Sequence, residues 1–375
     1  MNTPSATPAR TPVLPLDACR RQPRRLVSAL VAIALLLGAC STGSSSSPDS
    51  ASGDDDAEAT ARAGVIPATI DPVGVRDLVR DTIAGKRIAF IPISNSGFHL
   101  SGQMGIEMQR VFDMLGAEFE IHDPNFDNDR MVQIIDGLIN EGVDALVLHN
   151  PDVGVLTEQI RAAHEQGIYV VVVNMISNEA ADVFVGADVV SMGGDIGERA
   201  AADCADAGSN KVAVIDGWGT DGFSIGANAG WDPVLEEHGL DVVARQQGQY
   251  DPGAAFDVAT AILQQHPDLC AFLTNWDVMS LGVGQAVDAA GLTGTVGVYA
   301  FDASKDGCDS IASGTLTATA AYHVAGMGVA AATALQTLFE TDPGAGTTRA
   351  VAYIPHIVID DDNYQSVSMA CYASQ

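Results

Sequence analysis

The sequence predicts an α/β fold built of two doubly wound parallel-sheet lobes, and two observations predict it. First, short continuous apolar segments recur between residues 87 and 301, and each is followed by apolar residues at helical spacing. Apolar strands that alternate with amphipathic helices are typical of a parallel sheet covered on both faces. Second, this alternation of strands and helices begins again near residue 183, so that each half has the usual size of a domain.

The elements follow in order along the chain. In the first half we expect strands at 87–91, 118–122, 143–149 and 168–173, with helices at 104–115, 131–139 and 155–166. In the second half we expect strands at 183–185, 211–215, 240–244, 271–274 and 295–301, with helices at 196–205, 225–238, 254–265 and 278–290. Ligands of such sheets bind beyond the carboxyl ends of the strands. The loops that matter are therefore 93–99, 149–152, 174–178, 216–223, 274–277 and 301–305.

The N-terminal segment differs in composition from the rest. Four arginines within 20–25 precede the apolar run 26–37, which is too short to span a bilayer and is typical of an export signal. The run ends in Leu-Gly-Ala-Cys, which resembles a bacterial lipobox. Residues 1–39 are therefore expected to be a lipoprotein signal peptide, with Cys40 as the lipidated first residue. An ordinary signal peptide with a coincidental cysteine is the alternative, and the general and twin-arginine export routes both stay open. Residues 40–84, which begin with a serine run, are expected to form a disordered tether.

The charge of the chain excludes some partners. Removal of the signal would take away five of the 18 basic and one of the 48 acidic residues, so the formal net charge would change from −30 to −34. Such a surface repels nucleic acid and anionic lipid headgroups. We expect no nucleic-acid partner, and contact with a membrane only through the lipid anchor.

Four cysteines remain after the tether: Cys204, Cys270, Cys308 and Cys371. No CxxC pair occurs, so a zinc site is not expected. Disulfides can form outside the cell, and four cysteines allow three pairings. We favour a bond between Cys308 and Cys371, with buried free thiols as the alternative.

Three short motifs match the signatures of a dinucleotide site, a nucleophile elbow and a calcium loop, but the residues around them do not fit these functions. Residues 217–222 spell GxGxxG, but no acid ends the next strand as a dinucleotide site requires, so a plain glycine-rich loop is favoured. Residues 222–226 spell GxSxG, but Ser224 lies too far from its strand for a nucleophile elbow. We expect Ser224 to cap a helix N-terminus. Residues 123–134 lack the Gly and Glu of a calcium loop. No metal, cofactor or catalytic residue is expected.

Aromatic residues gather in the loops that follow strands. Phe98, Trp218 and Trp276 lie in such loops, and Tyr250 lies just past one. Aromatic residues at one end of a sheet suggest flat surfaces that line a cleft, although ordinary packing is the alternative for each. A sugar ring has apolar C–H faces that suit stacking and hydroxyls that suit Asp and Asn side chains. We expect Trp276 and its neighbour Asp277 to face a ligand together, although Asp277 and Asp302 could equally cap the helices that follow them.

Seven stretches, spread along the chain in one order, carry a family resemblance: SNSGFHLSGQMGIEMQ, GVDALVLHNPD, GIYVVVVN, GADVVSMGGDIGERAA, NWDVMSLG, VYAFDASKDG and GTLTATAAYHVAGMG. From about Arg87 to its end, the chain resembles the periplasmic sugar-binding proteins of ATP-driven importers, the ribose-binding group of type I solute-binding proteins. The resemblance implies the type I periplasmic-binding-protein fold, with a three-strand hinge between the lobes, and it implies no enzyme activity.

The resemblance also implies which residues bind the ligand. Phe98 would stack on one face of the ring, with His99 beside it. Asn150 would hydrogen-bond a hydroxyl group, and Asp302 would accept hydroxyl protons. The whole expected set comprises Phe98, His99, Asn150, Asn174, Trp218, Tyr250, Trp276, Asp277, Asp302 and Tyr322.

The sequence departs from the ribose binders at several of these positions. Asn174 and Met175 stand where ribose binders carry an Asp followed by an Arg, and Ile225 or a neighbour stands where they carry a second Arg. Trp276 replaces a polar Asn, and Tyr322 replaces a Gln. The loss of the Arg forks weakens the clamp on hydroxyl groups. We therefore expect a neutral sugar or sugar alcohol that is held more by stacking.

The expected organisation is an N-terminal lobe of residues 85–175 and 324–354 and a C-terminal lobe of residues 176–323 and 355–375, with crossings near 175–182, 322–325 and 354–357. A monomer on the outer face of the cell membrane, or in a periplasm, would close around its ligand and present it to an ABC permease. Two alternatives stay open. One is a receptor component that signals to a membrane kinase or chemoreceptor, and the other is an extracellular sugar-acting enzyme that uses Ser224 or Asp302.

Overall fold

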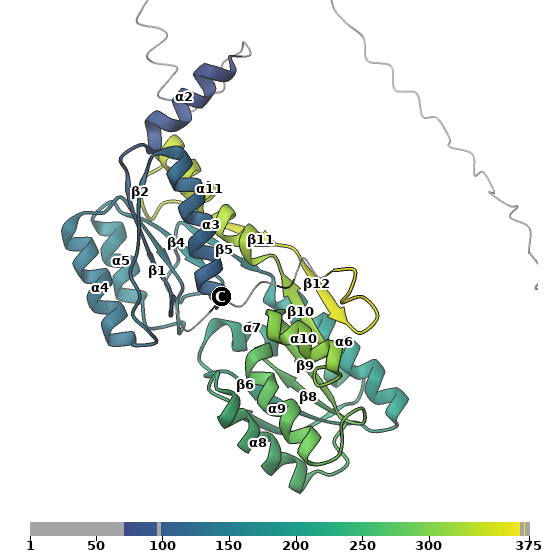
Figure 1. Cartoon of the computed structure of the whole chain (residues 1–375). Helices are drawn as coiled ribbons and strands as arrows, with labels where there is room; N and C mark the ends of the chain where they lie inside the picture. The colour runs from purple at the N-terminus through teal and green to yellow at the C-terminus, as the bar shows by residue number, and fades with distance from the viewer. Residues whose placement is uncertain (1–70, 96–98, 368–370, 372–375) are drawn as a thin grey trace, which may run out of the picture. The chain divides into compact units, whose positions relative to one another are not determined.

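The computed structural model describes residues 71–95, 99–367 and 371, and it folds them into two α/β lobes (Figure 1). The sheet of the N-terminal lobe has the order β11-β5-β4-β3-β1-β2. Its strands are β1 (Arg87–Ile91), β2 (Glu118–Ile121), β3 (Ala145–Leu148), β4 (Tyr169–Val173), β5 (Val183–Ala187) and β11 (Ala350–Ile354). The predicted fold class is confirmed.

The sheet of the C-terminal lobe has the order β12-β10-β9-β8-β6-β7. Its strands are β6 (Lys211–Asp216), β7 (Asp241–Gln247), β8 (Ala271–Thr274), β9 (Gly297–Asp302), β10 (Ala318–Tyr322) and β12 (His356–Asp360). Within the described part of the chain, all strand pairs in both sheets are parallel except β10 with β12.

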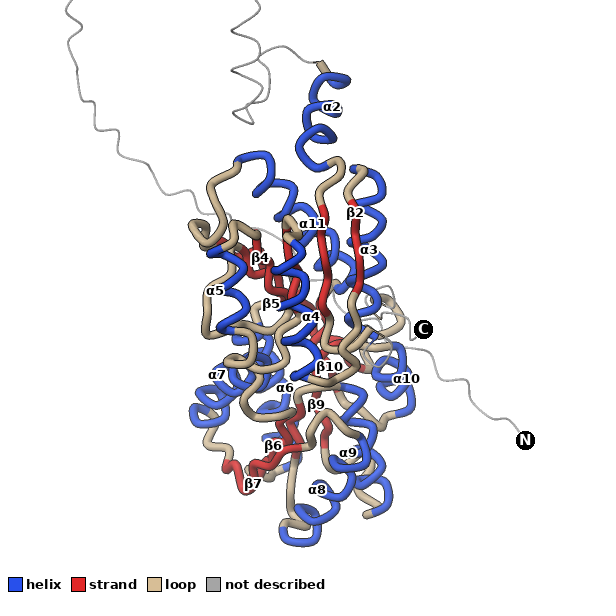
Figure 2. The backbone as a smooth tube through the Cα atoms, turned by 90° about the vertical axis from the view of Figure 1, so that its left-hand side faces the viewer, coloured by secondary structure: helices blue, strands red, loops and turns tan. Residues whose placement is uncertain are grey.

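Helices cover both faces of each sheet (Figure 2). In the N-terminal lobe, α3 (His99–Leu115) and α11 (Val324–Thr341) pack together on one face, and α4 (Asn128–Glu141) and α5 (Thr157–Glu165) pack on the other. In the C-terminal lobe, α6 (Val189–Ala207) pairs with α7 (Gly222–Glu237), whereas α8 (Pro252–Gln265) pairs with α9 (Asp277–Ala289), beside which lies α10 (Lys305–Ser313). None of the described helices is long and apolar enough to cross a bilayer.

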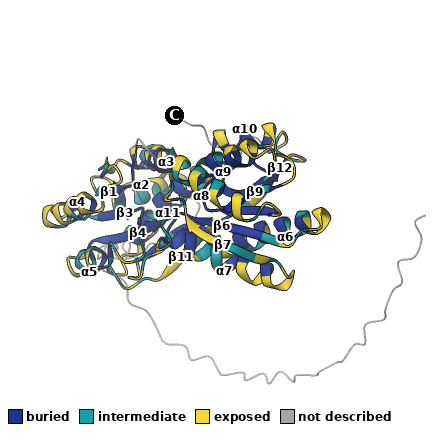
Figure 3. Cartoon of the chain, turned by 90° about the horizontal axis from the view of Figure 1, so that it is seen from below, coloured by how far each residue is buried: buried dark blue, intermediate teal, exposed yellow. Residues whose placement is uncertain are grey.

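Burial explains why these segments became strands and helices. All five residues of β4 are buried, and so are all four of β3 and of β8. The helices bury one side only, as Figure 3 shows by the exposed outer faces of α4 and α6. Local signals set their ends: the Asp127 side chain accepts the Arg130 amide at the start of α4, and Gly142 ends that helix in the left-handed conformation.

The first crossing between the lobes lies later than the sequence analysis expects. β5 pairs with β4 and β11, so it completes the first sheet instead of opening the second lobe. The chain therefore crosses after Ala187, not within 175–182. The other two crossings, between β10 and α11 and between β11 and β12, lie where they are expected. A buried apolar strand such as Val183–Ala187 could join either sheet, because nothing in its own residues specifies a partner.

The expected tether also ends earlier than residue 84. Residues 72–83 form a helix, α2 (Pro72–Ile83), that packs against α11 and α3 and buries Ile83 completely. Asp71 caps it by accepting the amides of Val73 and Gly74, and Pro72 occupies the first helical position. The sequence contains this capping signal, but the serine- and aspartate-rich residues before it favour the prediction of a tether.

Two disulfide bonds lie in the C-terminal lobe. One joins Cys308 to Cys371, which is the pair that the sequence analysis favours, and the other joins Cys204 of α6 to Cys270. Both bonds link segments that are more than 60 residues apart in the chain. Cys40 and the proposed signal peptide lie outside the described residues.

Candidate functional site

A cavity of about 240 Å³ lies where strand ends of the two lobes meet. Its lining is Ile93, Phe126, Met175, Trp218, Tyr250, Pro252 and Trp276. The first three residues follow β1, β2 and β4 of the N-terminal lobe, and the others follow β6, β7 and β8 of the C-terminal lobe. A molecule in this cavity would contact both lobes. The volume lies below the roughly 300–1,000 Å³ of drug-sized pockets, so a small ligand fits best.

Three aromatic rings form one wall of the cavity. The Tyr250 ring lies edge-on between the two indoles, with its centroid 4.8 Å from that of Trp218 and 6.0 Å from that of Trp276. A side chain at Gly217 would lie 2.0 Å from Cε2 of Tyr250, so only glycine leaves room for this ring. Gly217 thus makes space for the aromatic wall.

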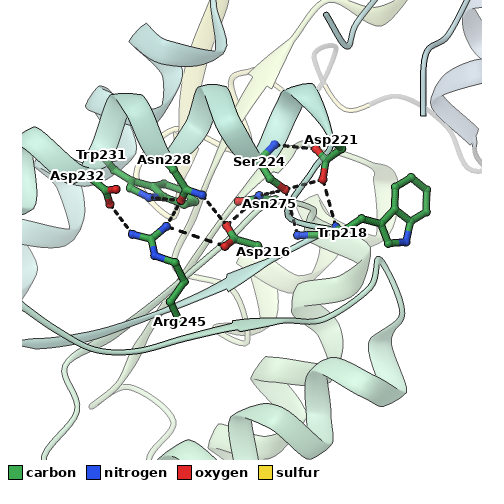
Figure 4. Close-up of polar contacts among 10 residues, drawn as sticks. Asp216, Trp218, Asp221, Ser224, Asn228, Trp231, Asp232, Arg245 and Asn275 are labelled. Carbon is green, nitrogen blue, oxygen red and sulfur yellow. Dashed lines mark hydrogen bonds and ion pairs between the residues drawn. The ribbon is translucent and has the colours of Figure 1, made fainter. Parts of the chain in front are cut away.

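The Asp221 carboxylate holds this wall in place. It is fully buried, and it accepts the Tyr250 hydroxyl at 2.9 Å, the Trp218 amide at 3.1 Å, and both the amide and the hydroxyl of Ser224 at 2.7 Å. Burial and the nearby carboxylate raise the pKa of Tyr250, so its hydroxyl stays a donor at neutral pH. Figure 4 shows the Trp218 ring pointing away from this polar cluster.

A second group of polar residues extends from Asp221 into the C-terminal lobe (Figure 4). Asn275, just before Trp276, donates to Ser224 Oγ at 2.6 Å and lies 3.4 Å from Asp216 Oδ1. Asp216 also accepts Asn228 Nδ2 at 3.0 Å, and Arg245 approaches it to 3.9 Å. Burial raises the pKa of the Asp216 carboxyl, which the hydrogen bonds partly oppose. The cluster supports the strand ends from behind.

The N-terminal lobe brings two asparagines to the same region. Asn150, after β3, is fully buried and donates to the Ile176 carbonyl at 2.8 Å. Asn174, after β4, is 3.3 Å from Nε2 of His149, whose Nδ1 is 3.0 Å from Ser101 Oγ. Burial lowers the pKa of His149 to about 3, so its imidazole is neutral.

The last three strand-end groups lie inside the C-terminal lobe. Asp302, the last residue of β9, accepts the Tyr322 hydroxyl at 2.6 Å. The Asp277 carboxylate is fully buried and accepts the amide of Ser304, the residue that caps α10, at 2.5 Å. Burial raises the pKa of Asp277 to about 7, and burial together with Asp277 raises the pKa of Asp302.

Several of these residues adopt a backbone conformation that L-residues avoid. Asn174 directly follows β4 and has φ 63°, Tyr250 lies in the turn after β7 and has φ 52°, and Asp302 is the last residue of β9 and has φ 96°. Non-glycine residues in this region cost about 1–3 kcal/mol each, and they concentrate at functional sites. Two of the three, Asn174 and Tyr250, lie at strand ends that also border the cavity.

Comparison with known proteins assigns the family. A model described as the periplasmic binding protein domain matches residues 88–342. The chain is a type I periplasmic binding protein. It is 28% identical to the ribose import binding protein of Bacillus subtilis (strain 168), over 61% of this chain and 73% of the relative.

Two further likenesses cover more of this periplasmic binding protein. A xylitol-binding protein of Mycolicibacterium smegmatis is 25% identical over 76% of the chain and 82% of its own length. An ABC transporter solute binding protein of Bacillus halodurans C-125, solved with bound myo-inositol, has a TM-score of 0.68 and 22% identity, over 76% of this chain and 99% of that one. At that identity the likeness shows the fold alone.

The family consists of solute-binding proteins that act outside the cytoplasm, not of enzymes. The Ser224 hydroxyl donates to Asp221 and accepts from the Gly217 amide and from Asn275 Nδ2. The expectation that Ser224 caps α7 is wrong, because Asp221 is the capping residue and Ser224 accepts no amide of the helix. The Asp221 carboxylate reaches the Ser224 amide, whereas the Ser224 hydroxyl turns back toward Gly217.

Only some of the predicted site residues border the cavity in the structure. Trp218, Tyr250 and Trp276 line the cavity, whereas Asn174 directly precedes the lining residue Met175 and Asn150 bonds the carbonyl of Ile176, the residue after it. His99 is the half-buried first residue of α3, and Phe98 lies outside the described residues. Asp302 and Tyr322 bond each other, and Asp277 bonds Ser304. The Asp277 carboxylate is therefore held within the lobe by the Ser304 amide, and it does not cap α9, the helix that it begins, so the alternative expected for it is not met either.

Sequence reasoning missed part of the cavity wall. Phe126, Ile93 and Pro252 line it but are absent from the predicted set, and Asp221 and Asn275 support it. Phe126 is an aromatic residue in a strand-end loop, so the rule applied to Phe98 would have found it. A larger groove of about 600 Å³ lies along α11 and α3. It is lined mainly by small side chains of α11 and contains none of the three aromatic rings, so we place the site in the smaller cavity.

Proposed function

We propose that this periplasmic binding protein captures a neutral sugar or sugar alcohol in the cavity between its lobes and delivers it to an ABC-type permease. The observation that carries the proposal is the cavity itself. It has three adjacent aromatic rings and apolar residues of both lobes in its wall, no lining residue carries a charge, and Asn174 and Asn275 directly precede the lining residues Met175 and Trp276. Aromatic faces suit the C–H surface of a sugar, and amides suit its hydroxyls.

The relatives support a small polyhydroxy ligand. The two curated relatives named above bind ribose and xylitol by their descriptions, and both compounds are neutral and rich in hydroxyl groups. This chain replaces the charged pair of the ribose binders with Asn174 and Met175, and Met175 lines the cavity. Stacking would therefore contribute more of the binding energy here than charged hydrogen bonds.

Ligand binding would work through closure of the two lobes. The chain crosses between them three times, after β5, β10 and β11, and these crossings are the proposed hinge. We propose a first lobe of residues 71–187 and 324–354 and a second lobe of residues 189–322 and 356–371. A ligand that contacts both lobes stabilises the closed form, which a permease can recognise.

A thermal-shift screen of the full chain tests the binding function. D-ribose, D-xylose, D-allose, xylitol and myo-inositol at millimolar concentration are the probes, with succinate as an anionic control. A ligand at about 100 times its Kd stabilises the fold by about 2.7 kcal/mol, which is several degrees in melting temperature. If no neutral sugar or polyol in an extended panel raises the melting temperature, the proposed function is wrong.

We further propose that Cys40 carries a lipid anchor. Mass analysis of the mature N-terminus and the Cys40→Ser variant test this, because the variant should leave the membrane fraction. Delivery to a permease is distinguished from signalling by the neighbouring genes. Permease and ATPase genes support transport, whereas a membrane kinase or chemoreceptor gene supports the sensor alternative.

A further inference from the structure

The helix that follows the second crossing between the lobes is capped by a histidine. His323 lies between β10, which ends at Tyr322, and α11, which begins at Val324. Its Nδ1 accepts the Gly326 amide at 3.1 Å. A Cβ at residue 326 would lie 2.4 Å from this nitrogen, so the absence of a side chain there lets the ring approach the helix. The imidazole therefore satisfies an amide in the first turn of α11.

The other described helices that have a side-chain cap use residues that do not titrate near neutral pH. Aspartates cap α2, α4, α6, α7 and α8, and a serine caps α10. A carboxylate with an ordinary pKa remains an acceptor above about pH 4, whereas an ordinary imidazole takes up its second proton near about pH 6.5. An imidazolium has no nitrogen left that can accept an amide, and its charge opposes the positive end of the helix dipole. Proton uptake therefore removes the cap of α11 and of no other helix in this group.

The titratable groups on the neighbouring elements have partners of their own. His323 is exposed, so protons reach it from solvent. Glu107 of α3 lines the same groove, and its carboxylate pairs with Arg110 at 2.9 Å. His356 begins the neighbouring strand β12, and its Nε2 lies 2.9 Å from the Asp195 carboxylate of α6. A nearby carboxylate eases proton uptake by an imidazole, and the acceptor is lost whenever the proton binds.

We propose that His323 is a pH-sensitive cap at the proposed hinge, whose protonation releases the first turn of α11 and lowers ligand affinity at acid pH. The link to affinity rests on the proposed function. The lobes turn about the three crossings when they close, and His323 is the residue that forms the second of these. A first turn without its cap gives this crossing more freedom in the open form. Closure around a ligand removes that freedom, so binding becomes weaker.

Amide hydrogen exchange of the unaltered chain tests the cap without any ligand. Mass spectrometry measures the protection of the first turns of α11, corrected for the intrinsic exchange rate at each pH. Between about pH 7.5 and about pH 5 this protection should fall about fivefold, as the loss of an N-cap predicts. The first turn of α4, which Asp127 caps, is the internal reference and should keep its protection. His323→Asn keeps an acceptor that does not titrate, so its protection should stay high, whereas His323→Ala should be low at both pH values.

Calorimetry with the tightest neutral ligand of the screen tests the coupling to closure. The ratio of the Kd of the unaltered chain to that of His323→Asn should rise about two- to tenfold between about pH 7.5 and about pH 5. Titration of Asp277 and of other groups that both chains share cancels in this ratio. His238→Asn is the matched control, because His238 is an exposed histidine that bonds Glu198 at the C-terminal end of α7, and it should keep the pH profile of the unaltered chain. In a His356→Asn background, the change in the ratio should persist.

The outcomes separate the cap from the proposed function. If the first turn of α11 keeps its protection at acid pH in the unaltered chain, or if His323→Asn loses it in parallel, the pH-sensitive cap is wrong. If protection falls while the Kd ratio stays constant, the coupling to closure is wrong. If no neutral compound binds at either pH, the proposed function itself fails, and the exchange data still decide the cap. Should a variant not fold, the comparison of α11 with α4 in the unaltered chain remains decisive.

Discussion

The Tyr250 hydroxyl tests whether Asp221 positions the aromatic wall of the cavity. The Tyr250→Phe substitution removes one donor, 2.9 Å from Asp221 Oδ1, and keeps the ring between the two indoles. A hydrogen bond to a charged group contributes about 1.5–3 kcal/mol to stability. Asp221 keeps three other donors, so we expect a loss near the lower limit, about 1.5 kcal/mol in the free energy of unfolding.

The substitution should also weaken ligand binding. Without its hydroxyl anchor, the ring is held only by edge contacts and can rotate about its side-chain bonds. Fixing it again on binding would cost about 0.5–1.5 kcal/mol, which raises Kd by about two- to tenfold. Calorimetry with the tightest neutral ligand of the screen measures this, and urea unfolding measures the stability.

Tyr169 provides a matched control in the N-terminal lobe. Its hydroxyl also donates to a carboxylate at 2.9 Å, that of Asp342, but it lies at the start of β4, at the opposite end of the sheet from the cavity. Tyr169→Phe should lower stability by a similar amount and leave Kd unchanged. If both variants lose stability and neither changes Kd, the reasoning that Asp221 positions the wall through Tyr250 is refuted.

Three further predictions follow from single features. Trp276→Ala should weaken ligand binding by about 1–3 kcal/mol through the lost stacking surface, and unchanged affinity in calorimetry would remove Trp276 from the site. The raised pKa of Asp277, about 7, means that the folded state keeps a proton which the unfolded chain releases near pH 4. This group therefore lowers the free energy of unfolding as the pH rises from about 4 to 7. The free energy of unfolding of Asp277→Asn, measured in urea, should exceed that of the unaltered chain by an amount that grows across this range. A difference that stays constant would contradict the burial argument. Replacing Cys308 and Cys371 together by Ala should lower the free energy of unfolding by about 2–4 kcal/mol, because the bond closes a long loop in the unfolded chain, and an unchanged denaturation midpoint would show that it does not restrain that loop.

The sequence by itself determined the fold class, and it indicated the end of each sheet at which the candidate site lies. Runs such as Tyr169–Val173 are apolar throughout because both faces of their sheet are covered, and this pattern is local. The aromatic residues after β6, β7 and β8 were also visible, because a loop position is read directly from the strand before it. These inferences need only neighbours in the chain.

Only the tertiary structure decided which groups meet. The sheet that β5 joins, the hydrogen bond from Tyr250 to Asp221, and the turn of Asp277 toward Ser304 each depend on segments that lie distant in the sequence. The same holds for the orientation of Asn150, Asn174 and Asn275, since a side-chain amide offers a donor and an acceptor and only its partner selects which end remains free. The residue type determines which hydrogen bonds a side chain can make, whereas the residues packed around it determine which of them form.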